Sequence, residues 1–350
     1  MVSPELFLGL LLVGFAGGAL GAAVGAVPAL GLAGVSIVVG EAIAVVTGGT
    51  TSSVLGIELA VVDATGLSAA VGFGPLLGPH VAFAGGAAAA AYAGRKGMID
   101  TSFRYHQAKQ IAKPLWRNPW SLVVGGVFGA LGVVVARLVA SVPVPLDPIA
   151  FAVVLSALAH RLALGYVLLG RVHGLDRSVL DMSPFETDEY WGDGGNPTAQ
   201  GIGGRHVVEP WQPDFDDWSV VTALGAGVGL GAGVLALATG SPFLAFGLAL
   251  ASLLAVPTGN YSVPVTHHIA LPAGIAALAA GSDPVAGVAL AVGFGTLGAL
   301  IGEISGRACY AHADTHFDPG FLSILVTSLV LGVLAVAGVL DGAAVPYPGI

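Results

Sequence analysis

Two glutamates lie within apolar stretches of the sequence, where an ionised side chain is costly. Glu41 has no basic residue near it, whereas Glu303 precedes Arg307 by one helical turn. A carboxylate at membrane depth costs at least about 2.5 to 3.5 kcal/mol and therefore needs a partner, a wet cavity or a neutral form. Glu303 is expected either to pair with Arg307 or to form an ion or proton site. Glu41 is expected to be protonated, to pair with Arg137 or Arg161, or to bind a cation.

Two polar runs interrupt the apolar sequence, and each precedes a short apolar segment. The first extends from Thr47 to Ser53 and the second from Thr258 to His268. Hydroxyl groups and free backbone amides at the start of a short helix suit an anion or a dehydrated ion. The alternative is an ordinary polar loop at the level of the lipid headgroups. The predicted substrate- or ion-binding residues are Glu41, Thr47, Thr50, Thr51, Ser52, Thr258, Asn260, Tyr261, His267, His268 and Glu303.

A weaker metal hypothesis concerns Cys309, His312, Asp314, His316 and Asp318. The two histidines would share one face if a helix continued through them, but the Asp318-Pro319 pair argues against continuation and favours a polar loop or contact surface. Nothing in the spacing of the other histidines demands haem. No cofactor is therefore expected, with Na+ or H+ as the coupling ion if the protein transports.

The composition excludes a soluble globular protein. Charged residues make up 9% of the chain and hydrophobic residues 55%, whereas soluble domains carry about 25% charged residues. No Walker A loop, nucleophile elbow or zinc-protease HExxH motif occurs, so neither ATP coupling nor catalysis is expected. Nucleic-acid binding is also not expected, because the net charge is -9. The sequence predicts an all-α, multi-pass membrane helix bundle.

The elements that position these residues are about nine to eleven membrane segments. A bilayer core of about 30 Å takes about 20 helical residues. Two short segments, 53–65 and 264–281, are predicted to be half-helices or re-entrant, the second broken by Pro272. The predicted spans are 5–26, 28–47, 68–94, 119–142, 148–170, 218–239, 242–257, 284–306 and 320–342.

An internal repeat is predicted from short identities between the two halves. A Thr-Gly pair follows the second span at Thr47 and the seventh at Thr258, and the tetrapeptide Val-Gly-Phe-Gly occurs at 71–74 and 292–295. The predicted units are residues 1–142, a linking span with an acidic loop at 143–217, and residues 218–350. If the short segments are re-entrant the repeats are inverted, and if they cross fully the repeats are parallel; the inverted version is favoured because many transporters use it.

Charge in the loops predicts the orientation in the cell membrane. The loop 95–118 holds six of the 12 basic residues, and the loop 171–217 holds ten acidic residues against three arginines. The positive-inside rule places the first loop in the cytoplasm, and two intervening spans return the second loop to that side.

A resemblance of type supports these expectations. Only three of the basic residues are lysine, and this composition, with the acidic loop, resembles uncharacterised haloarchaeal multi-pass membrane proteins. The Gly94-Arg95 and Gly306-Arg307 pairs, each followed by a polar stretch and a Pro-led span, look like the integral subunits of the methanogen sodium-translocating methyltransferase. That likeness implies sodium movement driven by a partner.

Together, these features favour a secondary transporter or ion-translocating protein with a site near the midplane between the repeats. The alternative is a non-transporting subunit or scaffold that docks a partner through the acidic loop. The expected partners are the lipid bilayer and a small solute or ion, with either a homo-oligomer or a partner subunit.

Overall fold

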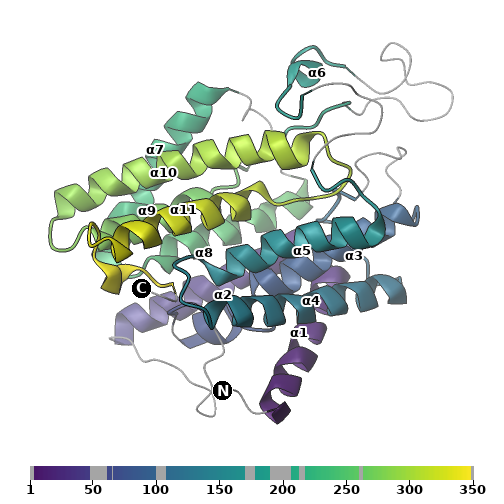
Figure 1. Ribbon diagram of the computed structural model, residues 1–350, viewed down its shortest axis with the longest axis horizontal. Coiled ribbons are helices and arrows are strands. Elements are labelled where there is room, and N and C mark those ends of the chain that lie inside the picture. The colour runs from purple at the N-terminus through teal and green to yellow at the C-terminus, as the bar shows by residue number, and fades with distance from the viewer. Residues whose placement is uncertain are drawn as a thin grey trace.

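The computed structural model describes residues 4–47, 61–64, 66–99, 108–169, 178–189, 206–212, 217–259 and 263–347. The regular elements in this part of the chain are helices, which confirms the predicted all-α class (Figure 1). The first half contains α1 (Pro4–Val24), α2 (Ala26–Thr47), two π-helical turns η1 (Ser68–Gly72) and η2 (Pro79–Phe83), α3 (Ala84–Arg95), α4 (Pro119–Ala140) and α5 (Pro148–Leu164).

The second half begins after the short helix α6 (Ser183–Glu186). It contains α7 (Trp218–Thr239), α8 (Phe243–Ser252) with its 3-10 continuation η4 (Leu253–Thr258), α9 (His267–Ala279), α10 (Pro284–Gly306) with a π-helical end η5 (Arg307–Ala311), and α11 (Pro319–Val336). A 3-10 turn, η6 (Gly342–Ala344), follows.

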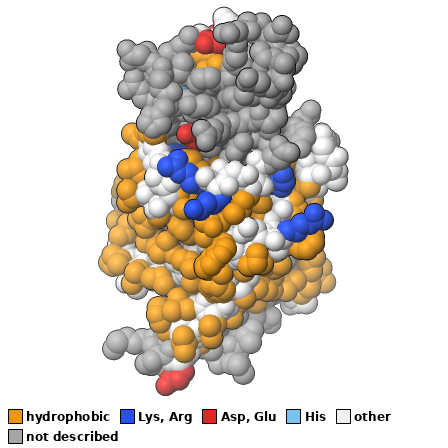
Figure 2. Space-filling view, turned by 90° about the vertical axis from the view of Figure 1, so that its right-hand side faces the viewer, with side chains coloured by type: hydrophobic (Ala, Val, Ile, Leu, Met, Phe, Trp, Pro, Cys, Tyr) orange, Lys and Arg blue, Asp and Glu red, His pale blue; other side chains and the backbone are white. Residues whose placement is uncertain are grey.

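Six of the described helices are long and apolar enough to cross a membrane: α1, α2, α4, α7, α10 with η5, and α11. Large apolar side chains remain exposed on them, for example Leu12 at 64% and Val46 at 86%. Hydrophobic side chains cover most of the coloured surface in Figure 2, with Lys and Arg across its upper part. Lipid is the environment that suits such a surface, so the chain is a membrane protein.

Asp-Pro pairs begin several of these helices. Asp147, Asp283 and Asp318 each lie just before a helix, with Pro as its first residue and a side-chain oxygen that accepts backbone N–H groups of the first turn. This combination suits a helix start because proline needs no hydrogen-bond acceptor and the carboxylate satisfies the free amides.

Glycine allows the helices to approach closely. A methyl group on Gly18 of α1 would lie 2.8 Å from Cα of Gly129 on α4, and one on Gly229 of α7 would lie 3.1 Å from Cα of Gly295 on α10. These distances require direct backbone contact, as in small-xxx-small packing. The glycine spacing in the sequence predicts such faces, and here each one contacts a specific partner helix.

The two halves pack their helices in the same way. In the first half α1 contacts α4, and α4 contacts α5; in the second half α7 contacts α10, and α10 contacts α11. The equivalent segments of α4 and α10 are Phe128-Gly129-Ala130-Leu131-Gly132 and Phe294-Gly295-Thr296-Leu297-Gly298. The tetrapeptides at 71–74 and 292–295 are therefore not equivalent, because the first lies in η1 and its following turn and the second in α10.

Equivalent helices run in opposite directions. The pairs α2 with α8 and α5 with α11 each join one helix from each half. Both pairs are antiparallel, as these contacts show: Gly31 with Leu254, Gly34 with Ala251, Val38 with Gly247, Pro145 with Gly332, Asp147 with Ser328, and Arg161 with Thr315. Because α5 packs as α11 does, the predicted boundary at residue 142 would separate α5 from the helices it packs with.

Two of the predicted segments, 68–94 and 264–281, differ in the structure. The span 68–94 is broken into η1, η2 and α3 around a turn that contains Pro75, followed by Pro79. The segment 264–281 is not broken at Pro272, because α9 is continuous from His267, beside Asp318 before α11, to Ala279, whose carbonyl accepts from the backbone N–H of Asp341 after α11. The predicted short segment 53–65 lies mostly outside the described residues.

We expect Gly229→Leu to destabilise the bundle and Gly227→Leu to have little effect. Both glycines lie on α7, but a methyl group on Gly229 would meet α10, whereas one on Gly227 has nothing within 4 Å. Overpacking a close contact costs about 1–3 kcal/mol or more. Thermal unfolding of the purified variants measures the difference, and equal melting temperatures would contradict the packing described here.

Candidate functional site

A cavity of about 640 Å³ lies at one end of the bundle, where both long loops attach. Its walls come from both halves: α2, η2 and the segment 109–112 from the first, and α7, η4, α9 and the segment 310–318 from the second. Residues 209–212 of the acidic loop complete it. A volume of this size is typical of sites for small organic ligands.

Asp318 lies in the cavity wall between two histidines. Its Oδ1 is 3.8 Å from Nε2 of His267, and its Oδ2 is 3.3 Å from Nε2 of His316. All three residues are buried, and neither ring nitrogen of His267 has a hydrogen-bond partner among the described residues. A carboxylate flanked by imidazoles can accept from a ligand or exchange protons with it.

The helix starts explain how the sequence assembles this group. Asp318 precedes α11, and its Oδ1 accepts from the backbone N–H of Phe321 at 2.8 Å. His267 is the first residue of α9, and its ring fits where a methyl group on Gly320 would lie 2.6 Å from Nε2. Two helix N-termini therefore meet at the carboxylate, where their dipoles favour negative charge.

His268 points to a different neighbour. Its ring centroid lies 5.1 Å from that of Trp211, and a methyl group on Gly302 of α10 would lie 2.6 Å from its Nε2. Trp211 lines the cavity and His268 is fully buried. The acidic loop therefore contributes an aromatic wall, and the histidine behind it fixes the position of that wall.

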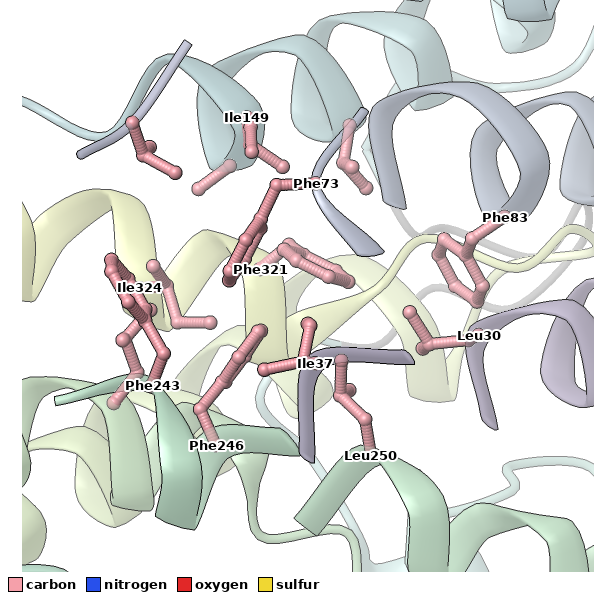
Figure 3. Packing of buried hydrophobic residues seen from close by; sticks show 14 of the residues in the cluster. Leu30, Ile37, Phe73, Phe83, Ile149, Phe243, Phe246, Leu250, Phe321 and Ile324 are labelled. Carbon is pink, nitrogen blue, oxygen red and sulfur yellow. The ribbon is translucent and has the colours of Figure 1, made fainter. Parts of the chain in front are cut away.

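Apolar aromatic side chains close the cavity toward the other end of the bundle. Phe321 packs against His267 at 5.1 Å between ring centroids and against Phe83 at 5.7 Å. Beyond them, Phe73 stacks with Phe246 at 5.8 Å. Figure 3 shows these rings converging from different helices. Phe83 and His267 line the cavity, so this aromatic cluster begins at the cavity wall.

The basic and acidic loops meet beside the cavity. Nζ of Lys109 lies 3.8 Å from Oε2 of Glu209, donates to the carbonyl of Ala311 at 3.2 Å and lies 4.3 Å from the ring centroid of Tyr310. The charge of Lys109 is therefore engaged by several groups. The contact also places the two loops on the same face of the molecule, while the cytoplasmic location stays a prediction.

Arg161 holds the segment that carries the cavity wall. Its guanidinium is fully buried and donates to Oγ1 of Thr315 at 2.7 Å and to the carbonyls of Cys309 and Leu168 at 2.7 and 2.8 Å. The planar group also lies 5.2 Å from the ring centroid of Phe317. The guanidinium therefore links α5 to residues 309–317. It neither pairs with Glu41 nor extends to the membrane–water interface.

Asp147 is the counterpart of Asp318 in the first half. Both are buried, precede Pro and accept from the following helix. Burial raises the pKa of Asp147 to about 6, although the N–H groups of Ile149 and Ala150 lower it. Burial also raises the pKa of Asp318, but the hydrogen bond with His316 and the charges of His267 and His316 lower it below its usual value. Asp318 is therefore ionised at neutral pH.

Few of the predicted site residues meet at this cavity. His267 and His316 line it, and His268 lies behind Trp211. Thr47 and Thr258 end two antiparallel helices, so these two residues lie at opposite ends of that pair. Thr50, Thr51, Ser52, Asn260 and Tyr261 lie outside the described residues.

The remaining predicted residues have other contacts. Oε1 of Glu303 accepts from Nε of Arg307 at 2.6 Å, which is the expected helix-end bridge. Glu41 accepts from Ser241. Within the described ranges no group of three or more His, Cys, Asp or Glu side chains is arranged to hold a metal ion, and Cys309, His312, Asp314 and His316 do not form one ligand set because the helix ends at Ala311.

Sequence reasoning did not assign a site role to Trp211 or Lys109, and it considered Asp318 only as a member of the weak metal cluster. The Asp318-Pro319 pair was visible, but only as a signal that the helix stops. The same Asp-Pro pair occurs at Asp147-Pro148, 14 residues before Arg161. This repeated pair was the sign in the sequence that the two halves contain equivalent helix starts.

Comparison with known proteins gives a family without a function. The model of the Family of unknown function (DUF7973) matches residues 1–348. No curated protein and no solved structure matches the chain. The function must therefore be argued from the geometry.

We expect Arg161→Lys to loosen residues 309–317, because an ammonium cannot reproduce the three directions of the guanidinium. The stability should fall by at least about 1.5 kcal/mol, the lower value for a hydrogen bond to a charged group. Cys309, the only cysteine and 8% exposed, reports the change: its maleimide labelling should accelerate. Arg137→Lys on α4 is the control, and an unchanged labelling rate in Arg161→Lys would contradict this role.

Proposed function

We propose that this chain, which belongs to the Family of unknown function (DUF7973), is a secondary transporter that binds a small solute in the cavity beside Asp318. The observation that carries the proposal is a cavity whose wall includes a buried carboxylate between His267 and His316. Ionisable groups buried in a membrane bundle are costly, and they mark substrate and ion pathways.

The arrangement of the two halves supports transport over a purely structural role. Secondary transporters recurrently use inverted repeats with a binding site between them and helix ends directed at the substrate. Here equivalent helices run antiparallel, both halves line the cavity, and the starts of α9 and α11 meet at Asp318.

The lining indicates the class of solute. Trp211, Tyr310 and Phe83 offer aromatic surface, and Asp318 offers an ionised acceptor. The charge of Lys109 is engaged by Glu209 and Ala311. A small organic molecule with a positively charged or hydrogen-donating end and an apolar body fits these groups, since cations bind both carboxylates and aromatic faces.

The alternative of a docking subunit has less support from the described loop. Met182, Val207 and Val208 of the acidic loop pack with Ala311 of the membrane part, and Glu209 pairs with Lys109. These contacts attach the loop to its own chain.

A thermal-shift panel on the purified protein tests the proposal, using choline, agmatine and methylammonium, with acetate and nucleobases for comparison, at constant ionic strength. A ligand at about 100 times its dissociation constant stabilises by about 2.7 kcal/mol. We expect an organic cation to raise the melting temperature. This increase should be lost in Asp318→Asn and retained in Asp147→Asn, the matched control at the equivalent helix start of the first half. A shift retained in Asp318→Asn would place the solute elsewhere and contradict the proposal.

A further inference from the structure

Glu41 has a carboxylate oxygen without a partner. The side chain is on α2 and the residue is 5% exposed. Its Oε2 accepts from Oγ of Ser241 at 2.6 Å, whereas its buried Oε1 has no hydrogen-bond partner among the described residues. Oγ of Ser241 accepts in turn from the backbone N–H of Phe243 at 3.2 Å, so its single proton is available for Glu41.

No basic side chain of the described residues forms an ion pair with this carboxylate. Arg161, the nearest candidate from the sequence, donates to residues 168, 309 and 315. An ionised carboxylate without a countercharge is strongly disfavoured in an apolar interior. An ionised Glu41 therefore needs one positive charge beside its Oε1.

A second polar side chain without a partner lies next to this position. Ser68 is fully buried and its Oγ has no hydrogen-bond partner among the described residues. It packs on Gly40, the residue before Glu41, where a methyl group would lie 3.0 Å from Cβ of Ser68. Ser68 also begins η1, a π-helical turn, and such turns are frequent at functional sites.

We infer that Glu41 and Ser241, with Ser68 as the third side-chain ligand, bind a sodium ion. The carboxylate supplies the negative charge, and the hydroxyl oxygens supply the hard ligands that replace water around a small cation. Glu41 lies toward the end of α2 that is opposite Val27 and the cavity, so this site is distinct from Asp318. A role of the ion in coupling rests on the proposed transport function, but the binding itself does not.

Sodium-dependent stability tests the site directly. The melting temperature of the purified protein is measured while NaCl replaces KCl at constant ionic strength, together with the stoichiometry of radioactive sodium binding. We expect a saturable stabilisation that is specific for Na+, with one ion bound per chain. Both signals should disappear in Glu41→Gln, which keeps an acceptor for Ser241, and weaken in Ser241→Ala and Ser68→Ala.

Two controls separate this inference from the proposed function. Glu303→Gln removes another buried carboxylate, one already paired with Arg307, and Asp318→Asn removes the cavity acid; both should retain the sodium signal. If Glu41→Gln does not fold, the two serine variants decide. Absence of a sodium-specific effect in the wild type, or its persistence in Glu41→Gln, would overturn the inference. A stability that depends on pH but not on Na+, and loses that dependence in Glu41→Gln, would overturn it by showing a protonated carboxyl.

Discussion

Direct contact between helix backbones at glycine is the constraint on which the rest of the structure depends. In a bilayer the lipid is as apolar as the side chains, so helices associate through close packing and internal hydrogen bonds. Gly18 with Gly129 and Gly229 with Gly295 bring α1 to α4 and α7 to α10 in matching ways. Gly34 and Gly247 bring the two halves together along α2 and α8. The antiparallel order of the halves follows from these contacts.

The functional features occur where this close packing stops. At one end of the bundle, the starts of α9 and α11 meet at Asp318, and the loops enclose a cavity instead of filling it. Arg161 supports this opening because it donates to the carbonyl of Cys309 in the last helical turn and to that of Thr315 beyond it. Toward the other end, Glu41 is buried beside Ser241. The two sites are thus separate and have different chemistry, one suited to an organic solute and one to a small ion.

The apolar runs were sufficient to predict an all-α membrane bundle, because hydropathy over about 20 residues reports directly on burial in lipid. The Glu303–Arg307 bridge was also accessible, since spacing within one helix fixes it. The Asp318 site was not, because it joins residues from α9 and from the loop before α11 and depends on Gly320 making room for His267. Thr47 and Thr258, which end α2 and η4, lie at opposite ends of that antiparallel pair, because the direction of those helices decides which ends meet.

The central claim is that equivalent helices of the two halves cross the membrane in opposite directions. Thr47 and Thr258 are exposed at the ends of α2 and η4, so a cysteine at either position, in a Cys309→Ser background, reports its side of the membrane. The direct measurement is labelling by a membrane-impermeant maleimide in intact cells and in inverted vesicles. The account predicts that the two positions are labelled from opposite sides, and labelling of both from the same side would contradict it.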